Sequence, residues 1–106
     1  MTTALLISTY NSPDFLRLCL SSVLGQSVLP DEILIADDGS TDLTARVVEE
    51  FYAASRAHVK HIRHKDKGFR LAAIRNKAIA ATKSDYIIQI DGDIILHKEF
   101  IADHIK

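Results

Sequence analysis

The sequence predicts an α/β fold in which a mostly parallel, four-stranded sheet carries helices on both faces. Short apolar runs alternate with segments whose apolar residues recur at helical spacing, and this strand–helix pair occurs four times. The links between the segments are short, which is typical of parallel crossover units. The apolar share of 47% and the charged share of 25% are those of an ordinary globular protein.

Length and charge limit the classes of protein to which the chain can belong. Its 106 residues predict a single domain, 1–106. The net charge of -1 argues against a broad nucleic-acid surface. Cys19 cannot form an internal disulfide, and it lies on an apolar helix face that favours a buried hydrophobe. No signal peptide and no apolar run of membrane-spanning length is found, so we expect a cytoplasmic location and no membrane segment. From the net charge we expect no nucleic-acid partner.

The first strand and helix are predicted from residues 4–9 and from the segment that follows them. The nearly continuous apolar run 4–9 indicates a strand covered on both faces. Ser12 before Pro13 is typical of a helix start, with the serine hydroxyl as the cap. The helix should run to about Gly25, and its predicted apolar stripe consists of Phe15, Leu16, Cys19, Leu20, Val23 and Leu24.

The second pair repeats this pattern. Residues 32–36 form the predicted strand, which ends in the polar segment 37–42. Ser40 or Thr41 is expected to cap the helix after it. The predicted buried stripe of that helix consists of Leu43, Val47, Val48, Phe51 and Tyr52.

The third strand, residues 58–64, contains three histidines and is less apolar, so we expect it nearer the edge of the sheet. Strand alternation places His58 and His64 on one face and His61 on the other. The three rings therefore cannot converge on a metal ion without a bulge. Solvated or edge-strand histidines are the favoured interpretation.

The last two pairs complete the predicted order. A polar loop, residues 65–70, precedes a helix from Leu71 to about Ala81 that is rich in alanine. Residues 86–90 are mostly β-branched or aromatic and predict a buried strand, which leads into Asp91-Gly92-Asp93. Residues 98–106 form an amphipathic final segment.

Right-handed crossovers bring the carboxyl ends of all parallel strands to one edge of the sheet, where ligands bind in open α/β folds. Asp91 and Asp93 at that edge would suit a divalent cation that keeps some waters and takes further ligands from a substrate phosphate. The residues expected to gather there are Ser8, Thr9, Tyr10, Asp37, Asp38, those of the segment 65–70, Asp91, Gly92 and Asp93.

Other interpretations of these residues are simpler. The acidic segment 37–40 could be a turn and helix cap, and the segment 91–93 could be a turn. An EF-hand starting at Asp91 is excluded, because Ile95 and Ala102 occupy two of its ligand positions.

Phosphate recognition must rest on other groups, because the sequence contains no glycine-rich phosphate loop. It would fall to the metal and to cations such as Arg70, Arg75 or Lys67. For Arg75 and Lys67, a phosphate contact and a solvated position are equally open, whereas Arg70 at the junction of loop and helix is favoured.

Five motifs follow one another along the chain, in residues 7–11, 26–27, 35–42, 68–78 and 91–93. Taken together, in this order and spacing, they resemble the N-terminal, nucleotide-binding half of family 2 glycosyltransferases with the GT-A fold. The likeness covers nearly the whole chain and implies a Rossmann-like sheet. Residues 68–76 look most like the branch that contains chondroitin-type polymerases.

The resemblance implies contacts to the nucleoside. Ser8, Thr9 and Tyr10 match the first-strand positions that hold it, with Tyr10 near the base. Asp38 matches the aspartate that reads the uracil of a uridine diphosphate (UDP) sugar, and Asp37 lies beside it.

The resemblance also implies how the diphosphate and the sugar are held. Arg70 matches an arginine near the base or the phosphates. Asp91 matches the residue near the ribose and the donor sugar, and Asp93 matches the direct ligand of Mn²⁺ or Mg²⁺, with Asp91 as the second candidate ligand. Enzymes of the family invert the anomeric centre, with a carboxylate as the base that deprotonates the acceptor hydroxyl.

GT-A domains are roughly twice as long as this chain. We therefore expect a truncated donor-binding portion that binds the nucleotide sugar but contains no catalytic base and no saccharide-acceptor site. The fourth strand would then be left uncovered, which favours a homodimer or aggregation.

Three alternatives belong to other classes. A receiver-like signalling module needs its acidic pair near the end of the first strand, where this chain has Ser8, Thr9 and Tyr10. A nucleotidyltransferase shares the metal carboxylates but usually begins with a glycine-rich loop. A non-catalytic nucleotide-binding module stays open.

Overall fold

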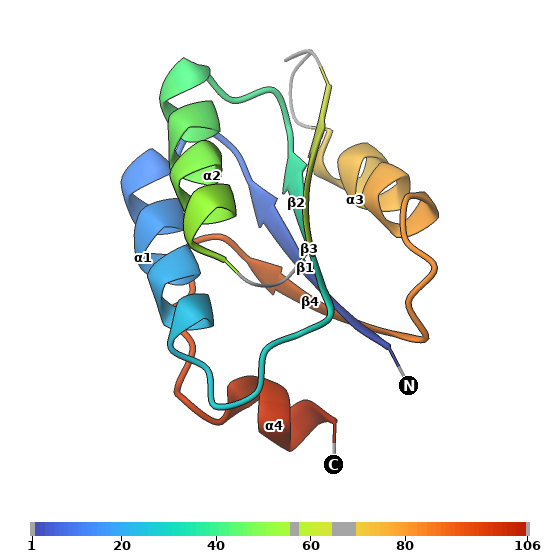
Figure 1. The fold of residues 1–106 in the computed structure, drawn as a ribbon. Helices are drawn as coiled ribbons and strands as arrows, with labels where there is room; N and C mark the ends of the chain where they lie inside the picture. The colour runs from blue at the N-terminus through green and yellow to red at the C-terminus, as the bar shows by residue number, and fades with distance from the viewer. Residues whose placement is uncertain (1, 56–57, 65–69, 106) are drawn as a thin grey trace.

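The predicted strands form one parallel sheet. The computed structural model describes residues 2–55, 58–64 and 70–105, and within them the strand order is β3-β2-β1-β4 (Figure 1). All neighbouring strands pair in parallel, which confirms the predicted fold class. The strands are β1 (Thr3–Thr9), β2 (Glu32–Asp37), β3 (His58–Arg63) and β4 (Tyr86–Asp91).

Helices cover both faces of this sheet. Figure 1 shows α1 and α2 side by side on one face and α3 on the other. The short α4 lies near the C-terminus, and its Ile101 is fully buried in the core on the α1 and α2 side. The helices are α1 (Pro13–Leu24), α2 (Asp42–Ala54), α3 (Leu71–Ala80) and α4 (Phe100–His104).

Strand β1 is the centre of both core layers. All seven of its residues are buried. Leu5 and Ile7 pack toward α1 and α2, whereas Ala4 and Leu6 pack toward α3 with Ile74. A strand covered on both faces needs apolar residues at every position, which explains the continuous apolar run.

The strand order creates a switch point beside β1. The chain moves from β1 to β2 and β3 on one side, and it then returns to place β4 on the other side of β1. At the carboxyl end, Ser8 pairs with Ala36 on one side and with Asp91 on the other. In open α/β sheets, ligands bind at this reversal of strand order.

The edge strands differ from β1. The prediction that β3 lies at an edge is confirmed. The prediction that β4 is buried is wrong for half of its residues, because β4 is the other edge strand of the described sheet. Ile88 and Ile90 are buried and Ile87 packs against the core on the α3 side, while Tyr86 and Gln89 are exposed, so both faces of β4 are covered less completely than those of β1.

The apolar stripes of α1 and α2 are narrower than predicted. Leu16, Cys19, Leu20, Val23, Val47, Val48 and Phe51 are buried, but Phe15, Leu24, Leu43 and Tyr52 are 40–64% exposed. The two helices lie side by side on one sheet face (Figure 1), so only residues on their inner sides are covered.

The predicted side-chain caps of these helices are also wrong. Ser12 Oγ donates to the Tyr10 carbonyl instead of accepting from the helix, and the side chain of Thr41 makes no capping hydrogen bond.

Cys19 is a buried hydrophobe, as predicted. Its side chain is fully buried in the α1 core. Burial, and to a lesser extent the nearby charge of Asp93, raise the pKa of the Cys19 thiol to about 11. The thiol is therefore protonated and inert at neutral pH.

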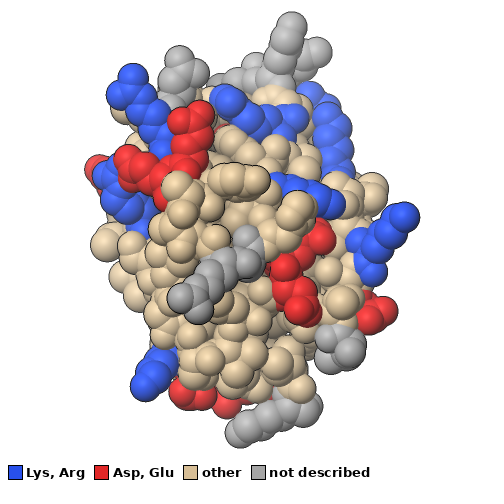
Figure 2. Space-filling view, in the orientation of Figure 1, with Lys and Arg blue, Asp and Glu red and all other residues tan. Residues whose placement is uncertain are grey.

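Charges of both signs lie in small groups on the face shown in Figure 2, separated by uncharged surface. No helix in the described ranges combines the length and the hydropathy needed to cross a membrane.

Candidate functional site

A cleft lies at the carboxyl ends of the strands, at the switch point beside β1. Its volume is about 180 Å³. Three strand ends contribute to it, because residues after β1, β2 and β4 meet there although they are far apart in the sequence. The described lining consists of Ser8, Thr9, Tyr10, Ser12, Asp38, Asp91, Gly92 and Asp93.

Gly92 allows β1 and β4 to approach closely at the floor of this cleft. Its backbone N–H donates to the Ser8 carbonyl over 2.7 Å. A Cβ atom at this position would lie 2.9 Å from the Ser8 carbonyl oxygen and 3.3 Å from Thr9 Cβ. Only glycine fits without a shift of backbone, and this contact sets the positions of Asp91 and Asp93 on either side of it.

Arg75 on α3 connects the same two strand ends from the other side. Its Nε donates to Ser8 Oγ, and its Nη2 donates to Asp91 Oδ1, both over 2.9 Å. Hydrogen bonds between charged groups are among the stronger ones in proteins. The interpretation of Arg75 as a solvated helix residue is therefore wrong. Its guanidinium group holds the side chains of Ser8 and Asp91 in the cleft.

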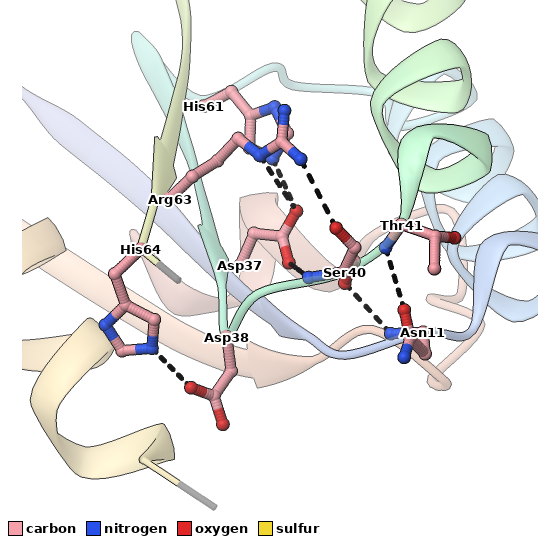
Figure 3. A network of polar contacts seen from close by, with 8 residues as sticks. All are labelled: Asn11, Asp37, Asp38, Ser40, Thr41, His61, Arg63 and His64. Atoms are coloured by element: carbon pink, nitrogen blue, oxygen red, sulfur yellow. Dashed lines mark hydrogen bonds and ion pairs between the residues drawn. The ribbon is translucent and has the colours of Figure 1, made fainter. Parts of the chain in front are cut away.

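Asp38 is fixed by three partners although it lines the cleft. Its backbone N–H donates to the Thr9 carbonyl over 3.0 Å. Its Oδ2 accepts from the Arg70 backbone N–H over 2.9 Å, and its Oδ1 is hydrogen-bonded to His64 Nε2 (Figure 3). The carboxylate is thus held in one orientation.

Asp37 points away from Asp38, as Figure 3 shows. Its carboxylate is fully buried and accepts from the Ser40 backbone N–H and pairs with His61, each over 2.8 Å. Arg63 Nε lies 3.8 Å from Asp37 Oδ2. Asp37 is not among the described lining residues, and its carboxylate holds the turn after β2 through the Ser40 N–H.

The environment of Asp37 lowers its pKa. Burial alone would raise the pKa of this carboxyl, but hydrogen bonds from His61 and from the side chain and backbone of Ser40 outweigh it, so the net shift is downward from the usual 3.8. A lowered pKa means that Asp37 stabilises the fold above its unfolded-state pKa, and that this contribution is lost as the pH falls through the folded-state value.

The exchange of Asp37 for asparagine should therefore make the fold less sensitive to acid. At neutral pH we expect a loss of about 1–3 kcal/mol in the free energy of unfolding, because His61 and Ser40 lose a charged acceptor. Below about pH 4 the difference from the wild type should shrink. Urea unfolding at several pH values measures both effects, and a difference that stays constant down to pH 2 would contradict this assignment.

Asn11 and Ser40 join the ends of β1 and β2. The Asn11 backbone N–H donates to Ser40 Oγ, and Asn11 Oδ1 accepts from the Thr41 N–H over 2.8 Å (Figure 3). Asn11 has a φ of 43°, a left-handed conformation that asparagine tolerates better than most residues. Ser40, predicted as a possible helix cap, instead accepts from Asn11.

The structure brings most of the predicted site residues together. Ser8, Thr9, Tyr10, Asp38, Asp91 and Asp93 line the cleft. Arg70 is not among the described lining residues, but its backbone holds Asp38 there. Lys67 and the rest of segment 65–69 lie outside the described residues.

The prediction of edge-strand histidines is confirmed for His58 and His61, which lie on β3, but the alternative of solvated rings is wrong for His61 and His64. The His64 side chain is 5% exposed and pairs with Asp38, and the His61 side chain is 18% exposed and pairs with Asp37. The register of β2 and β3 places Asp37 opposite Arg63, and continuing that register by one residue places Asp38 beside His64. The register was the missing signal, because strand alternation alone does not show which residues of two strands are paired.

Asp91 and Asp93 provide the carboxylate oxygens for a candidate metal site. Both side chains are exposed and line the cleft on either side of Gly92. No group of three or more His, Cys, Asp or Glu residues that could hold a metal occurs in the described part of the chain. Two carboxylates fit a hard cation that completes its shell with waters and a diphosphate.

The sequence profile of "Glycosyl transferase family 2" matches residues 4–106. The chain belongs to this family. It is also 35% identical over 104 residues to a chondroitin synthase of Escherichia coli, a match that covers 97% of this chain and 15% of that protein. The chain thus spans only a small part of this relative.

Solved structures of GT-A glycosyltransferases share the fold. Staphylococcus aureus TarS (1–349) in complex with UDP-GlcNAc matches with a TM-score of 0.85 and 26% identity, over 99% of this chain and 30% of that one. Glucosyl-3-phosphoglycerate synthase from Mycobacterium tuberculosis, in complex with Mn²⁺, UDP and glucosyl-3-phosphoglycerate, matches with a TM-score of 0.66 and 26% identity. The latter match covers 95% of this chain and 37% of that one. These matches confirm the predicted family and its GT-A fold.

Proposed function

We propose that this family 2 chain binds a UDP-sugar with a divalent metal ion, for inverting transfer of the sugar to an acceptor hydroxyl in polysaccharide or glycoconjugate synthesis. One observation carries the proposal. The cleft at the switch point combines an aromatic ring and hydroxyl groups after β1 with one carboxylate after β2 and two at the end of β4. Two structural neighbours were solved with UDP-GlcNAc and with UDP and Mn²⁺, and these ligands support this choice of nucleotide and metal.

The nucleoside would bind at the β1 and β2 side of the cleft. Tyr10 is 44% exposed there and offers a ring on which a base can stack. The Asp38 carboxylate is an acceptor for the N3–H group of uracil. Ser8 and Thr9 at the end of β1 would line the path of the ribose.

The diphosphate would bind at the β4 side, where Asp91 and Asp93 would hold Mn²⁺ or Mg²⁺. When bound, the metal would neutralise negative charge on the departing diphosphate. Arg75 fixes the Asp91 carboxylate over 2.9 Å, and this contact keeps one carboxylate oxygen oriented before a ligand arrives. Arg70 remains a candidate for contact with the base or phosphates.

The cleft covers only part of such a ligand, since pockets for small molecules usually measure about 300–1,000 Å³. We further propose that the acceptor site and the catalytic base lie outside residues 1–106. In this proposal, the three carboxylates of the cleft already bind the uracil and the metal ion, so none of them is left to act as the catalytic base. The chain also spans only 30% of TarS (1–349).

Competition between nucleotides tests the proposed donor. In the presence of Mn²⁺, UDP should bind more tightly than GDP and ADP by about tenfold or more. Adenine has no ring N–H to donate to the Asp38 carboxylate, and guanine presents its N1–H farther from the ribose than uracil presents its N3–H. Isothermal titration with the three diphosphates measures the difference. Equal binding of all three, or a preference for a purine, would contradict UDP as the nucleotide.

A further inference from the structure

The contact between His64 and Asp38 is the one buried histidine–carboxylate pair that reaches the cleft among the described residues. His64 lies directly after β3, and Asp38 lies directly after β2. The side chains are 5% and 2% exposed, and Figure 3 shows the imidazole directed at the carboxylate. The proposed function gives Asp38 a role in binding the base but gives none to His64.

The geometry leaves Asp38 few free positions for a ligand. A carboxylate has two oxygens, each with two lone pairs. His64 occupies one lone pair of Oδ1, and the Arg70 N–H occupies one of Oδ2. With both oxygens held, the carboxylate cannot rotate freely, and its remaining lone pairs point in fixed directions.

Asp38 is the only polar partner of His64 in the described chain. The carboxylate offers only lone pairs, so His64 Nε2 carries the hydrogen of this bond. The other ring nitrogen, Nδ1, is buried without a hydrogen-bond partner among the described residues. A buried polar atom without a partner lowers the free energy of unfolding. The His64 ring lies beside Asp38 although its Nδ1 atom destabilises the fold in this way.

The orientation of the Asp38 carboxylate affects which pyrimidine base it can bind. Uracil presents an N3–H donor, whereas cytosine presents a lone pair at N3 and a donor only at its N4 amino group. A carboxylate held toward N3 accepts from uracil and repels cytosine. A carboxylate that can rotate could reach the N4 amino group and accept cytosine as well.

We propose that His64 is a positioning residue for base selection, which fixes the Asp38 carboxylate so that the cleft takes a uracil nucleotide and rejects a cytosine nucleotide. This inference rests on the proposed function of the cleft. His64 acts through Asp38 and does not itself touch the ligand.

Two amide variants of His64 test this role. Glutamine places its amide nitrogen near the position of Nε2, whereas asparagine is too short and places it near Nδ1. Isothermal titrations with UDP and CDP in Mn²⁺ should give the wild type a preference for UDP of about tenfold or more. His64→Gln should retain this preference, and His64→Asn should reduce it to about threefold or less, mainly through weaker UDP binding.

His61→Gln is the matched control, because His61 forms the neighbouring pair with Asp37, which is not among the described lining residues. It should leave the UDP-to-CDP ratio unchanged even if it lowers the melting temperature. A role of His64 in stability alone would lower the melting temperature of His64→Asn without changing the ratio, and that result would overturn the inference while leaving the proposed function intact.

The remaining outcomes separate the two proposals. A wild type that binds neither nucleotide would overturn the proposed function, and the inference with it. A wild type that binds UDP and CDP equally would overturn the inference alone.

If His64→Asn does not fold, nitrogen-15 spectra of the wild type provide the test. Saturation with UDP should shift the His64 ring nitrogens more than CDP does, and unchanged His64 signals would contradict the inference.

Discussion

Replacing Asp93 with asparagine should lower the affinity for UDP in the presence of Mn²⁺ by about 100-fold. Asp93 is an exposed carboxylate of the cleft, and the proposed metal depends on it and on Asp91. Even groups that only support a metal ligand change affinity or activity by about 10–100-fold when they are replaced, and a direct ligand should matter at least as much. The measurement is isothermal titration with UDP in Mn²⁺.

Asp103→Asn is the control for this change, because it removes the same charge from an exposed aspartate on α4, away from the described lining. It should leave UDP binding unchanged. The melting temperature of Asp93→Asn should stay close to that of the wild type, since substitutions on the surface usually change stability by about 0.5 kcal/mol or less. Normal Mn²⁺-dependent binding by Asp93→Asn would remove Asp93 from the metal site.

Replacing Gly92 with alanine should damage both the fold and the cleft. The new Cβ would lie 2.9 Å from the Ser8 carbonyl oxygen, which belongs to a central strand and cannot move aside cheaply. Forcing an extra carbon into a packed site costs about 1–3 kcal/mol. The shift needed to relieve the contact would separate the ends of β1 and β4, so UDP affinity should also fall, by about tenfold.

Gly25 provides the matched substitution. An alanine Cβ there would lie 3.8–3.9 Å from the Ser21 and Ser22 carbonyl oxygens, which is ordinary van der Waals contact. Gly25→Ala should therefore leave UDP affinity unchanged and alter the free energy of unfolding far less than Gly92→Ala. Chemical denaturation and UDP titration of both variants measure the difference, and equal effects would refute the role assigned to Gly92.

Much of the fold was predictable because the strands have clear local signals. The bounds predicted for β1 and β4 differ from the observed ones by about one residue, since both end at a change from apolar to polar residues. The meeting of Ser8, Asp38 and Asp91 at one edge followed from the parallel direction of the strands, which brings their carboxyl ends to the same edge of the sheet. Six of the predicted site residues line the cleft for this reason.

What the sequence did not reveal depends on contacts between elements. Periodicity places Phe15 and Tyr52 on an apolar face, but it does not show how far the neighbouring helix covers that face, and both residues are more than half exposed. The pairing of His64 with Asp38 depends on the register between β2 and β3. The two contacts of Arg75 depend on how α3 lies across the strand ends.

Titration of the chain with UDP, once with Mn²⁺ and once with a metal chelator, tests most directly whether the cleft is a metal-dependent site for a uridine nucleotide. We expect binding in Mn²⁺ and a loss of affinity of about tenfold or more in the chelator, because Asp91 and Asp93 would then face the diphosphate without a cation between them. Binding that is equally tight with and without the metal, or no binding under either condition, would contradict the proposed function.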